Sequence, residues 1–188
     1  NWQDEISPQE GDQVKILHTA RDKAITWDLS GSFGDWTIEN YTNSLTANVT
    51  LSLGSMTVGT TNRTTTLSFS KPVVVAGDLT LMKGAKLTHP ENASVQTVQL
   101  DVTVQGDCTI ETDASINVTA KGAKNEYSHN LAHGGRTFTC NNKGVVSELS
   151  ATCFGSARCP TAVGGGYRVD NANISHGGGA VKLSVGGA

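Results

Sequence analysis

Residues 73–87 read VVVAGDLTLMKGAKL, and residues 102–116, which lie 29 positions further along, read VTVQGDCTIETDASI. The two stretches share two valines, a Gly-Asp dipeptide, a threonine and an alanine at corresponding positions. A shorter copy, GSMTV, lies at 54–58, which is 23 positions before the GDLTL of the first stretch. Repeats with irregular spacing are typical of a parallel β-helix, whose coils carry loop insertions of different lengths.

Each copy of the repeat can be interpreted as a turn followed by a strand. Glycine tolerates a positive φ and aspartate accepts hydrogen bonds from nearby backbone amides, so the Gly-Asp pair predicts the turn. The apolar residues on either side of the threonine are expected to point into the core, while the threonine faces solvent. Cys108 occupies the position that Leu79 holds in the earlier copy, so we expect its side chain in the core. One coil cannot bury its inner face alone, and the copies are therefore expected to stack.

The composition favours an all-β chain. It contains 23 threonines and 21 glycines against 4 prolines, and a branched Cβ suits a strand better than a helix. Alternating segments such as LTANVTLSL at 45–53 predict half-buried strands, and no stretch has a sustained helical period. The sequence therefore predicts an all-β, right-handed parallel β-helix or solenoid-like stack. An antiparallel β-sandwich, which also uses short strands separated by turns, is the alternative.

A chain of 188 residues is expected to form a single domain with a substantial core. Residues 1–13 are polar and are interpreted as an N-terminal arm, and residues 14–188 as one β-rich domain. Within the domain we distinguish a strand-rich part at 14–70, the repeat turns at 71–123, and a glycine-rich, cysteine-containing part at 124–188.

Charge and motif content exclude several classes of function. The net charge is −3 and charged residues make up 16% of the chain, so we expect no nucleic-acid partner. No apolar run approaches the roughly 18–20 residues that cross a bilayer, and we expect no membrane span. The chain has no nucleophile elbow, P-loop or dinucleotide fingerprint, and we expect no cofactor.

Asn-x-Ser/Thr sequons are more frequent than chance combination of these residues would give. The chain begins at Asn1 without a basic and apolar leader, which we interpret as a removed signal peptide or as a start within a longer chain. Both observations favour a secreted or cell-surface glycoprotein, although a threonine-rich chain also collects sequons by chance. The candidate glycosylation sites are Asn40, Asn48, Asn62, Asn92, Asn117 and Asn173.

Four cysteines are consistent with an oxidising compartment. Three of them lie in a polar segment rich in glycine, where a disulfide could hold loops that have no apolar periodicity of their own. Four cysteines allow three pairings, and the sequence does not choose among them. The disulfide candidates are Cys108, Cys140, Cys153 and Cys159.

The stretch 75–122, VAGDLTLMKGAKLTHPENASVQTVQLDVTVQGDCTIETDASINVTAKG, is followed by a glycine-rich segment. It resembles the β-helical repeats of large secreted and cell-surface proteins, and the resemblance extends over about residues 70–180. The GDLTL turn, the AKLTH step and the INVTAKG exit into glycine loops carry it. The resemblance implies an adhesin- or fibre-like protein, and it concerns location and architecture rather than chemistry.

Two groups of side chains invite a metal or catalytic interpretation. His129 and His133 form an H-x3-H pair, but Asn130 stands where a metalloprotease has glutamate, and adjacent glycines disfavour a helix. Asp78 and Asp107 occupy corresponding turns and could bind calcium or serve a polysaccharide lyase on a β-helix. Turns also favour aspartate after glycine for structural reasons alone. We therefore expect loop and turn roles here, with no catalytic site and no metal site.

An aromatic cluster lies near the N-terminus. Exposed aromatic rings can stack on sugars, although core packing is their commoner role. The cluster consists of Trp27, Phe33, Trp36 and Tyr41.

The function that these features favour is that of a non-enzymatic extracellular glycoprotein with a structural or adhesive role. Residues 180–188 read AVKLSVGGA and predict a terminal strand with an unpaired edge, which a copy of the same chain could extend into a surface fibre or oligomer. The alternative is a glycan-binding or polysaccharide-lyase-like protein on a β-helical scaffold, with surface glycans as its partners. The residues of the self-association edge are Val181, Leu183 and Val185.

Overall fold

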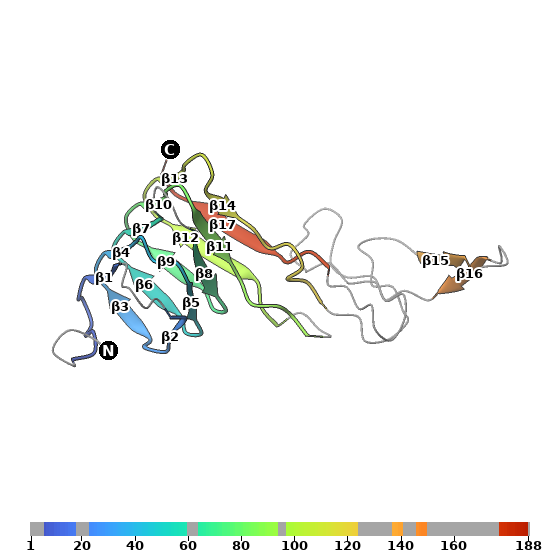
Figure 1. The fold of residues 1–188 in the computed structure, drawn as a ribbon, viewed down its shortest axis with the longest axis horizontal. Coiled ribbons are helices and arrows are strands. Elements are labelled where there is room, and N and C mark those ends of the chain that lie inside the picture. The colour runs from blue at the N-terminus through green and yellow to red at the C-terminus, as the bar shows by residue number, and fades with distance from the viewer. Residues whose placement is uncertain are drawn as a thin grey trace. The chain divides into compact units, whose positions relative to one another are not determined.

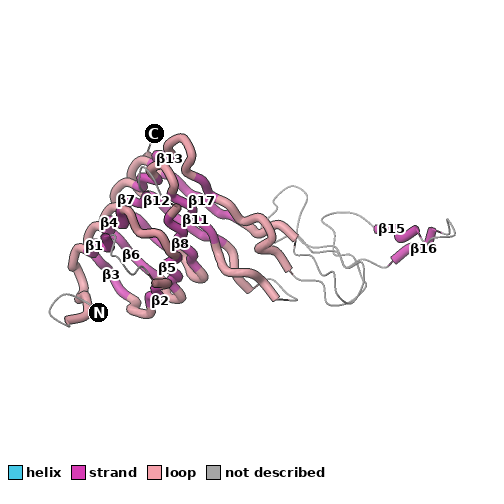
Figure 2. Tube along the Cα trace, in the orientation of Figure 1, coloured by secondary structure: helices cyan, strands magenta, loops and turns pink. Residues whose placement is uncertain are grey.

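The computed structural model describes most of the N-terminal two thirds of the chain and a short C-terminal segment. Two strands, at 137–140 and 146–149, are described by their backbone alone. The described residues form strands connected by loops and turns, without a helix (Figure 2). The residues described in full are 6–17, 23–59, 64–93, 97–123 and 177–187.

The chain divides into two compact units. The first contains the solenoid and comprises Asn1–Thr88, Leu100–Asn117 and Leu183–Ala188. The second comprises His89–Gln99 and Val118–Lys182. It includes an antiparallel hairpin of strands β15 and β16, at Thr137–Cys140 and Val146–Leu149.

Three five-stranded parallel sheets build the solenoid (Figure 1). Sheet A has the order β1-β4-β7-β10-β13, with strands at Val14–Leu17, Trp36–Glu39, Met56–Gly59, Leu79–Leu81 and Cys108–Ile110. Sheet B has the order β2-β5-β8-β11-β14, with strands at Ile25–Trp27, Ser44–Ala47, Thr65–Phe69, Ala85–Thr88 and Ser115–Ile116. Sheet C has the order β3-β6-β9-β12-β17, with strands at Gly31–Phe33, Leu51–Leu53, Val73–Val75, Leu100–Val104 and Val181–Val185.

Successive strands visit sheets A, B and C in turn, so every three strands make one coil. Coil 1 contains β1, β2 and β3, coil 2 contains β4, β5 and β6, and coils 3 and 4 continue in the same way to β12. Coil 5 contains β13, β14 and β17. This arrangement is a parallel β-helix, which confirms the predicted fold class and excludes the antiparallel sandwich. The handedness of the coil stays a prediction.

The repeat found in the sequence is one coil position occupied several times. Leu79 pairs with Met56 on one side and with Cys108 on the other, which confirms the predicted alignment of the three copies. Met56 also pairs with Trp36, which belongs to a further copy, GDWTI at 34–38. The sequence analysis missed this copy, although it carries the same Gly-Asp and threonine signal.

The interior of the solenoid consists of columns of apolar side chains that run along the coils. In sheet B, Leu45, Leu67 and Leu87 stand in register, and each of them is fully buried. Complete burial of one such side chain contributes about 1.5–3 kcal/mol. The threonine of each repeat forms an outward column, as predicted, and in coils 2 to 4 its neighbours in the strand are buried. That column contains Thr37, Thr57, Thr80 and Thr109.

Aromatic rings fill the first two coils. Trp27 meets Phe33 edge-to-face with ring centroids 5.3 Å apart, and it meets Trp36 at 4.6 Å. These three side chains and Tyr41 are all buried. Core packing of the aromatic cluster is therefore confirmed, and none of the four rings is placed to stack on a sugar.

Candidate functional site: the C-terminal end of the solenoid

Stacked glycines form one corner of the solenoid, between sheets C and A. The amide of Gly54 donates to the carbonyl of Gly34 at 3.1 Å, and Gly77 donates to Gly54 at 2.7 Å. Gly106 donates to Gly77 at 3.0 Å, and Gly187 continues the series by donating to Gly106 at 2.9 Å. The glycine-to-glycine hydrogen bond of the corner therefore recurs up to coil 5.

The aspartates that follow these glycines hold the corner together. The carboxylate Oδ1 of Asp35 accepts from the amide of Ser55 at 2.8 Å, and Asp78 Oδ1 accepts from the amide of Asp107 at 2.9 Å. Between them, the hydroxyl of Ser55 accepts from the amide of Asp78 at 3.3 Å. Each side chain thus caps the coil that follows it. We interpret Asp78 and Asp107 as turn-forming residues, in keeping with the expectation from sequence.

Among the residues that the structure describes, no group of three or more His, Cys, Asp or Glu side chains is placed to hold a metal ion. His129 and His133, the pair considered for zinc, lie outside the described residues. The described part of the chain also contains no helix that is long and apolar enough to cross a membrane.

Coil 5 differs from coils 1 to 4 because the side chains at its inward positions are exposed or only half-buried. Ile110 continues the column of Leu81, yet Ile110 is 44% exposed whereas Leu81 is fully buried. The strands of this coil, β13, β14 and β17, are the terminal strands of their sheets in the described part of the chain. No described residue covers their inner side chains, and within the described part of the chain the apolar columns end at exposed residues.

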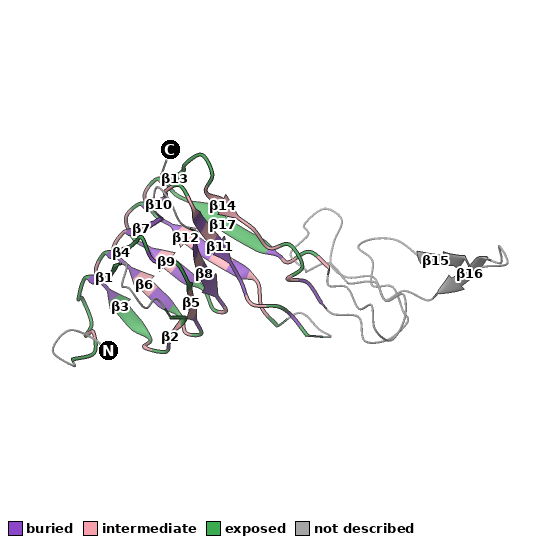
Figure 3. Cartoon of the chain, viewed as in Figure 1, coloured by how far each residue is buried: buried purple, intermediate pink, exposed green. Residues whose placement is uncertain are grey.

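Strand β17 shows the same exposure in sheet C. The amide of Gly186 donates to the carbonyl of Val104 at 2.8 Å, just as the amide of Gln105 donates to Val75 one coil earlier. Val185 therefore takes the inward position that Val104 holds one coil earlier, where Val104 is buried. Figure 3 shows β17 as exposed. The exposed fractions along the predicted self-association edge are 43% for Val181, 37% for Leu183 and 42% for Val185.

Cys108 also stands at this end. It pairs with Leu79 in sheet A as predicted, but it is only half-buried, whereas Leu79 is fully buried. The prediction that Cys108 lies in the core is therefore wrong. Its place in the column directs the side chain inward, but burial also requires another layer of residues over it. Burial nevertheless raises the pKa of the thiol, and Cys108 is a free cysteine.

The other disulfide candidates give no pairing. Cys140 ends strand β15, of which only the backbone is described, and Cys153 and Cys159 lie outside the described residues.

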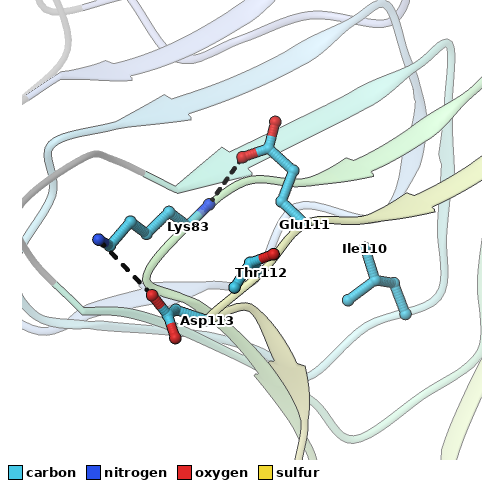
Figure 4. Close-up of a pocket in the computed structure, with 5 residues that line it drawn as sticks. All are labelled: Lys83, Ile110, Glu111, Thr112 and Asp113. Atoms are coloured by element: carbon cyan, nitrogen blue, oxygen red, sulfur yellow. Dashed lines mark hydrogen bonds and ion pairs between the residues drawn. The ribbon is translucent and has the colours of Figure 1, made fainter.

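Two stacked turns form a hollow of about 580 Å³ at the rim of coil 5 (Figure 4). The backbone amide of Lys83 donates to Glu111 Oε2 at 3.1 Å, and Lys83 Nζ lies 3.5 Å from Asp113 Oδ2. Both members of this ion pair are more than half exposed, and such pairs contribute little to stability. With Thr112 and Ile110, these side chains line the hollow. No described hydrogen bond joins a nucleophile to a base among these side chains. The hollow lies between the exposed Ile110 of sheet A and the charged side chains of the turn that follows it.

The sequons differ in their accessibility. Asn40 and Asn48 are exposed, and Asn117 is half-buried. Asn92 is 1% exposed, and its Nδ2 donates to the carbonyls of Val98 and Lys121 at 2.8 and 2.9 Å. Asn92 is therefore removed from the candidate glycosylation sites, because the atom that would carry the glycan is enclosed in the folded chain. Asn62 and Asn173 lie outside the described residues.

The site is thus the apolar, strand-edged end of coil 5, with a polar hollow at one corner. Its geometry is that of a contact surface, and the carboxylates that the sequence singled out serve the backbone of the corner. Compared with known protein families, curated proteins and solved structures, the chain shows no match.

Proposed function

We propose that the chain is a non-enzymatic structural or adhesive module of an extracellular glycoprotein, and that it associates with copies of itself through the end of coil 5. The observation that carries this proposal is the contrast within single columns. Side chains such as Ile110 and Val185 occupy inward positions and stay exposed, while the residues one coil below are buried. Covering such an apolar surface removes it from water and lowers the free energy.

Two physical terms favour association at this end. Burial of the remaining apolar surface of Ile110, Leu183 and Val185 is worth about 1 kcal/mol for each side chain. Parallel strands at the end of a sheet also present backbone amides and carbonyls that another strand can pair with. Pairing of two C-terminal ends would give a closed dimer, and head-to-tail stacking would give a fibre.

Other features support a structural role and not a catalytic one. The carboxylates of Asp35 and Asp78 accept hydrogen bonds from the next coil. The rings of the aromatic cluster are buried, which leaves the glycan-binding alternative without its predicted platform. The sequons at Asn40 and Asn48 are exposed, as glycosylation requires, which favours the glycoprotein interpretation. Because both lie in coil 2, glycans there would leave the end of coil 5 open.

Sedimentation of two matched variants of β17 tests the proposal. Leu183→Lys places a charge in the inward column, whereas Ser184→Lys places the same charge one residue further along the strand. We expect the native chain and S184K to associate with rising concentration and L183K to remain monomeric. Particles that are strictly monomeric up to about 1 mM, where a contact of about 4 kcal/mol is half-saturated, would contradict self-association. Electron microscopy then distinguishes fibres from closed particles.

A further inference from the structure

A buried histidine, His89, begins the first segment of the second unit. The side chain of His89 is fully buried, and it is packed against the backbone of Gly179. A Cβ atom added to Gly179 would lie 2.2 Å from His89 Nε2 and 2.8 Å from the Cβ of Val118. Only glycine can approach the imidazole this closely.

The segment that covers His89 is held by backbone hydrogen bonds. The amide of Gly179 donates to the carbonyl of Val118 at 2.8 Å, and the amide of Gly122 donates to Gly177 at 2.8 Å. Residues 177–180 and 118–123 therefore run side by side, and we call this pair of segments the clasp. Ala123 and Ala180 are buried together within it.

Uncharged hydrogen bonds lock the loop beneath the clasp. Asn92 Nδ2 donates to the carbonyls of Val98 and Lys121, and its Oδ1 accepts from the amides of Thr97 and Val98 at 2.7 and 2.8 Å. These contacts do not titrate near neutral pH. Of the fully buried side chains that the structure describes, His89 is the one that can gain a proton in this range.

The surroundings of His89 disfavour a positive charge. Nδ1 lies 2.7 Å from the carbonyl of Pro90, which can only accept, so Nδ1 carries a proton and donates it there. Among the described residues, the positive charge of Lys121 acts against a positive charge on His89. The Nζ of Lys121 is itself 3.6 Å from a carboxylate oxygen of Glu91. Residues 177–180 carry no charge. Burial first and Lys121 next lower the pKa of His89, whereas the carbonyl of Pro90 raises it.

We propose that the clasp is an acid-sensitive device, which opens when His89 takes up a proton. Protonation would add a second positive charge near Lys121 at a buried position, where desolvation disfavours the charged form, so the protonated form favours the open clasp. The segment leads directly into β17, so opening also releases the start of that strand. The device does not depend on self-association of the chain.

The direction of the pH dependence follows from linkage. In the closed clasp the pKa of His89 is lowered, so the neutral imidazole is favoured. In the open clasp the pKa of His89 is expected to lie near its ordinary value of 6.5. The population of the open form is therefore constant above that value and rises as the pH falls below it. The rise is up to about tenfold per pH unit and ends at the pKa of the closed form.

Hydrogen exchange between pH 7.5 and 5.0 tests the proposal, with each rate corrected for its intrinsic dependence on pH. The protection factors of the Gly122 and Gly179 amides are expected to fall by up to about tenfold at pH 5.5 relative to pH 7.5. The amide of Gly54, which donates to Phe33 in the solenoid, is the internal control and should keep its protection. Unchanged protection at Gly122 and Gly179 would overturn the proposal.

A His89→Asn variant separates the charge from the packing. Its side-chain amide can donate to the carbonyl of Pro90 as Nδ1 does, but it does not titrate, so the pH dependence should vanish. Persistence of the dependence in H89N would assign it to another group. Should H89N fail to fold, a nuclear magnetic resonance titration of His89 in the native chain replaces it, and a pKa at or above 6.5 would overturn the proposal.

Discussion

The two ends of the solenoid use the same columns of inward positions and reach opposite outcomes. At the N-terminal end, Ile16 and Phe33 are 8% and 6% exposed. At the C-terminal end of the same two columns, Ile110 and Val185 are 44% and 42% exposed. Alternation places a side chain inside the coil in both cases, but only contact with a covering layer removes it from water. The comparison shows that inward direction and burial are separate properties in a stacked fold.

Side-chain size explains part of the difference. Trp27, Phe33 and Trp36 contact one another across coils 1 and 2, so large rings fill the interior close to its first layer. Coil 5 has shorter aliphatic residues and a half-buried cysteine at the corresponding depth. Within the described chain, the N-terminal end is therefore closed by its own large rings, whereas the inward residues of coil 5 stay exposed or half-buried.

Truncation of one inward residue at each end gives the largest expected contrast. Trp27→Ala should lower the free energy of unfolding by about 3–5 kcal/mol, because it empties a packed aromatic site. Ile110→Ala should cost less than about 1 kcal/mol, since much of the side chain is already in water. Chemical denaturation of the monomeric chain measures both. A cost for I110A as large as that for W27A would mean that the C-terminal end is covered.

The glycine corner should behave alike at both ends, in contrast to the interior. A Cβ at Gly106 would lie 2.3 Å from Asp78 Oδ1, and one at Gly34 would lie 2.9 Å from the carbonyl oxygen of Gly11. Gly34→Ala and Gly106→Ala should therefore each cost about 1–3 kcal/mol, with G106A the more severe. Gly178→Ala is the matched control, because a Cβ there meets no atom within 4 Å. Thermal unfolding of the three variants measures the effect, and a neutral G106A would show that the corner can shift.

Local chemistry explains why the repeat could be predicted from sequence. Gly-Asp turns act through the backbone amides next to them, so GDLTL and GDCTI identify the register that pairs Leu79 with Cys108. The same signal was present in GDWTI at 34–38, and a search with the full pattern would have extended the repeat by one coil. Turn chemistry and alternation therefore predicted the Gly-Asp turns, the stacking of the copies and the outward threonines.

The burial or exposure of individual side chains could not be predicted from the sequence, because it depends on residues far away in the chain. The sequon at Asn92 satisfies a local consensus, but its side chain is enclosed by Lys121, which lies 29 positions away. The packing of Gly179 against His89 joins residues 90 positions apart, and neither residue stands in a recognisable motif. Ile110 alternates in the same way as Leu81, and its exposure depends on the absence of a covering coil in the described chain.

The smallest effect concerns the two indoles at the closed end. Trp27 Nε1 donates to the carbonyl of Leu29 at 2.6 Å, whereas Trp36 Nε1 is buried and has no hydrogen-bond partner among the described residues. Trp27→Phe removes a bonded donor and leaves a carbonyl to resatisfy, while Trp36→Phe removes a donor that was never satisfied. Since both lose similar ring volume, W36F should be less destabilising than W27F by about 1 kcal/mol in urea denaturation. Equal costs would indicate that the Trp36 indole is hydrogen-bonded in solution, and the aromatic interior of the closed end would then contain a polar partner such as a buried water.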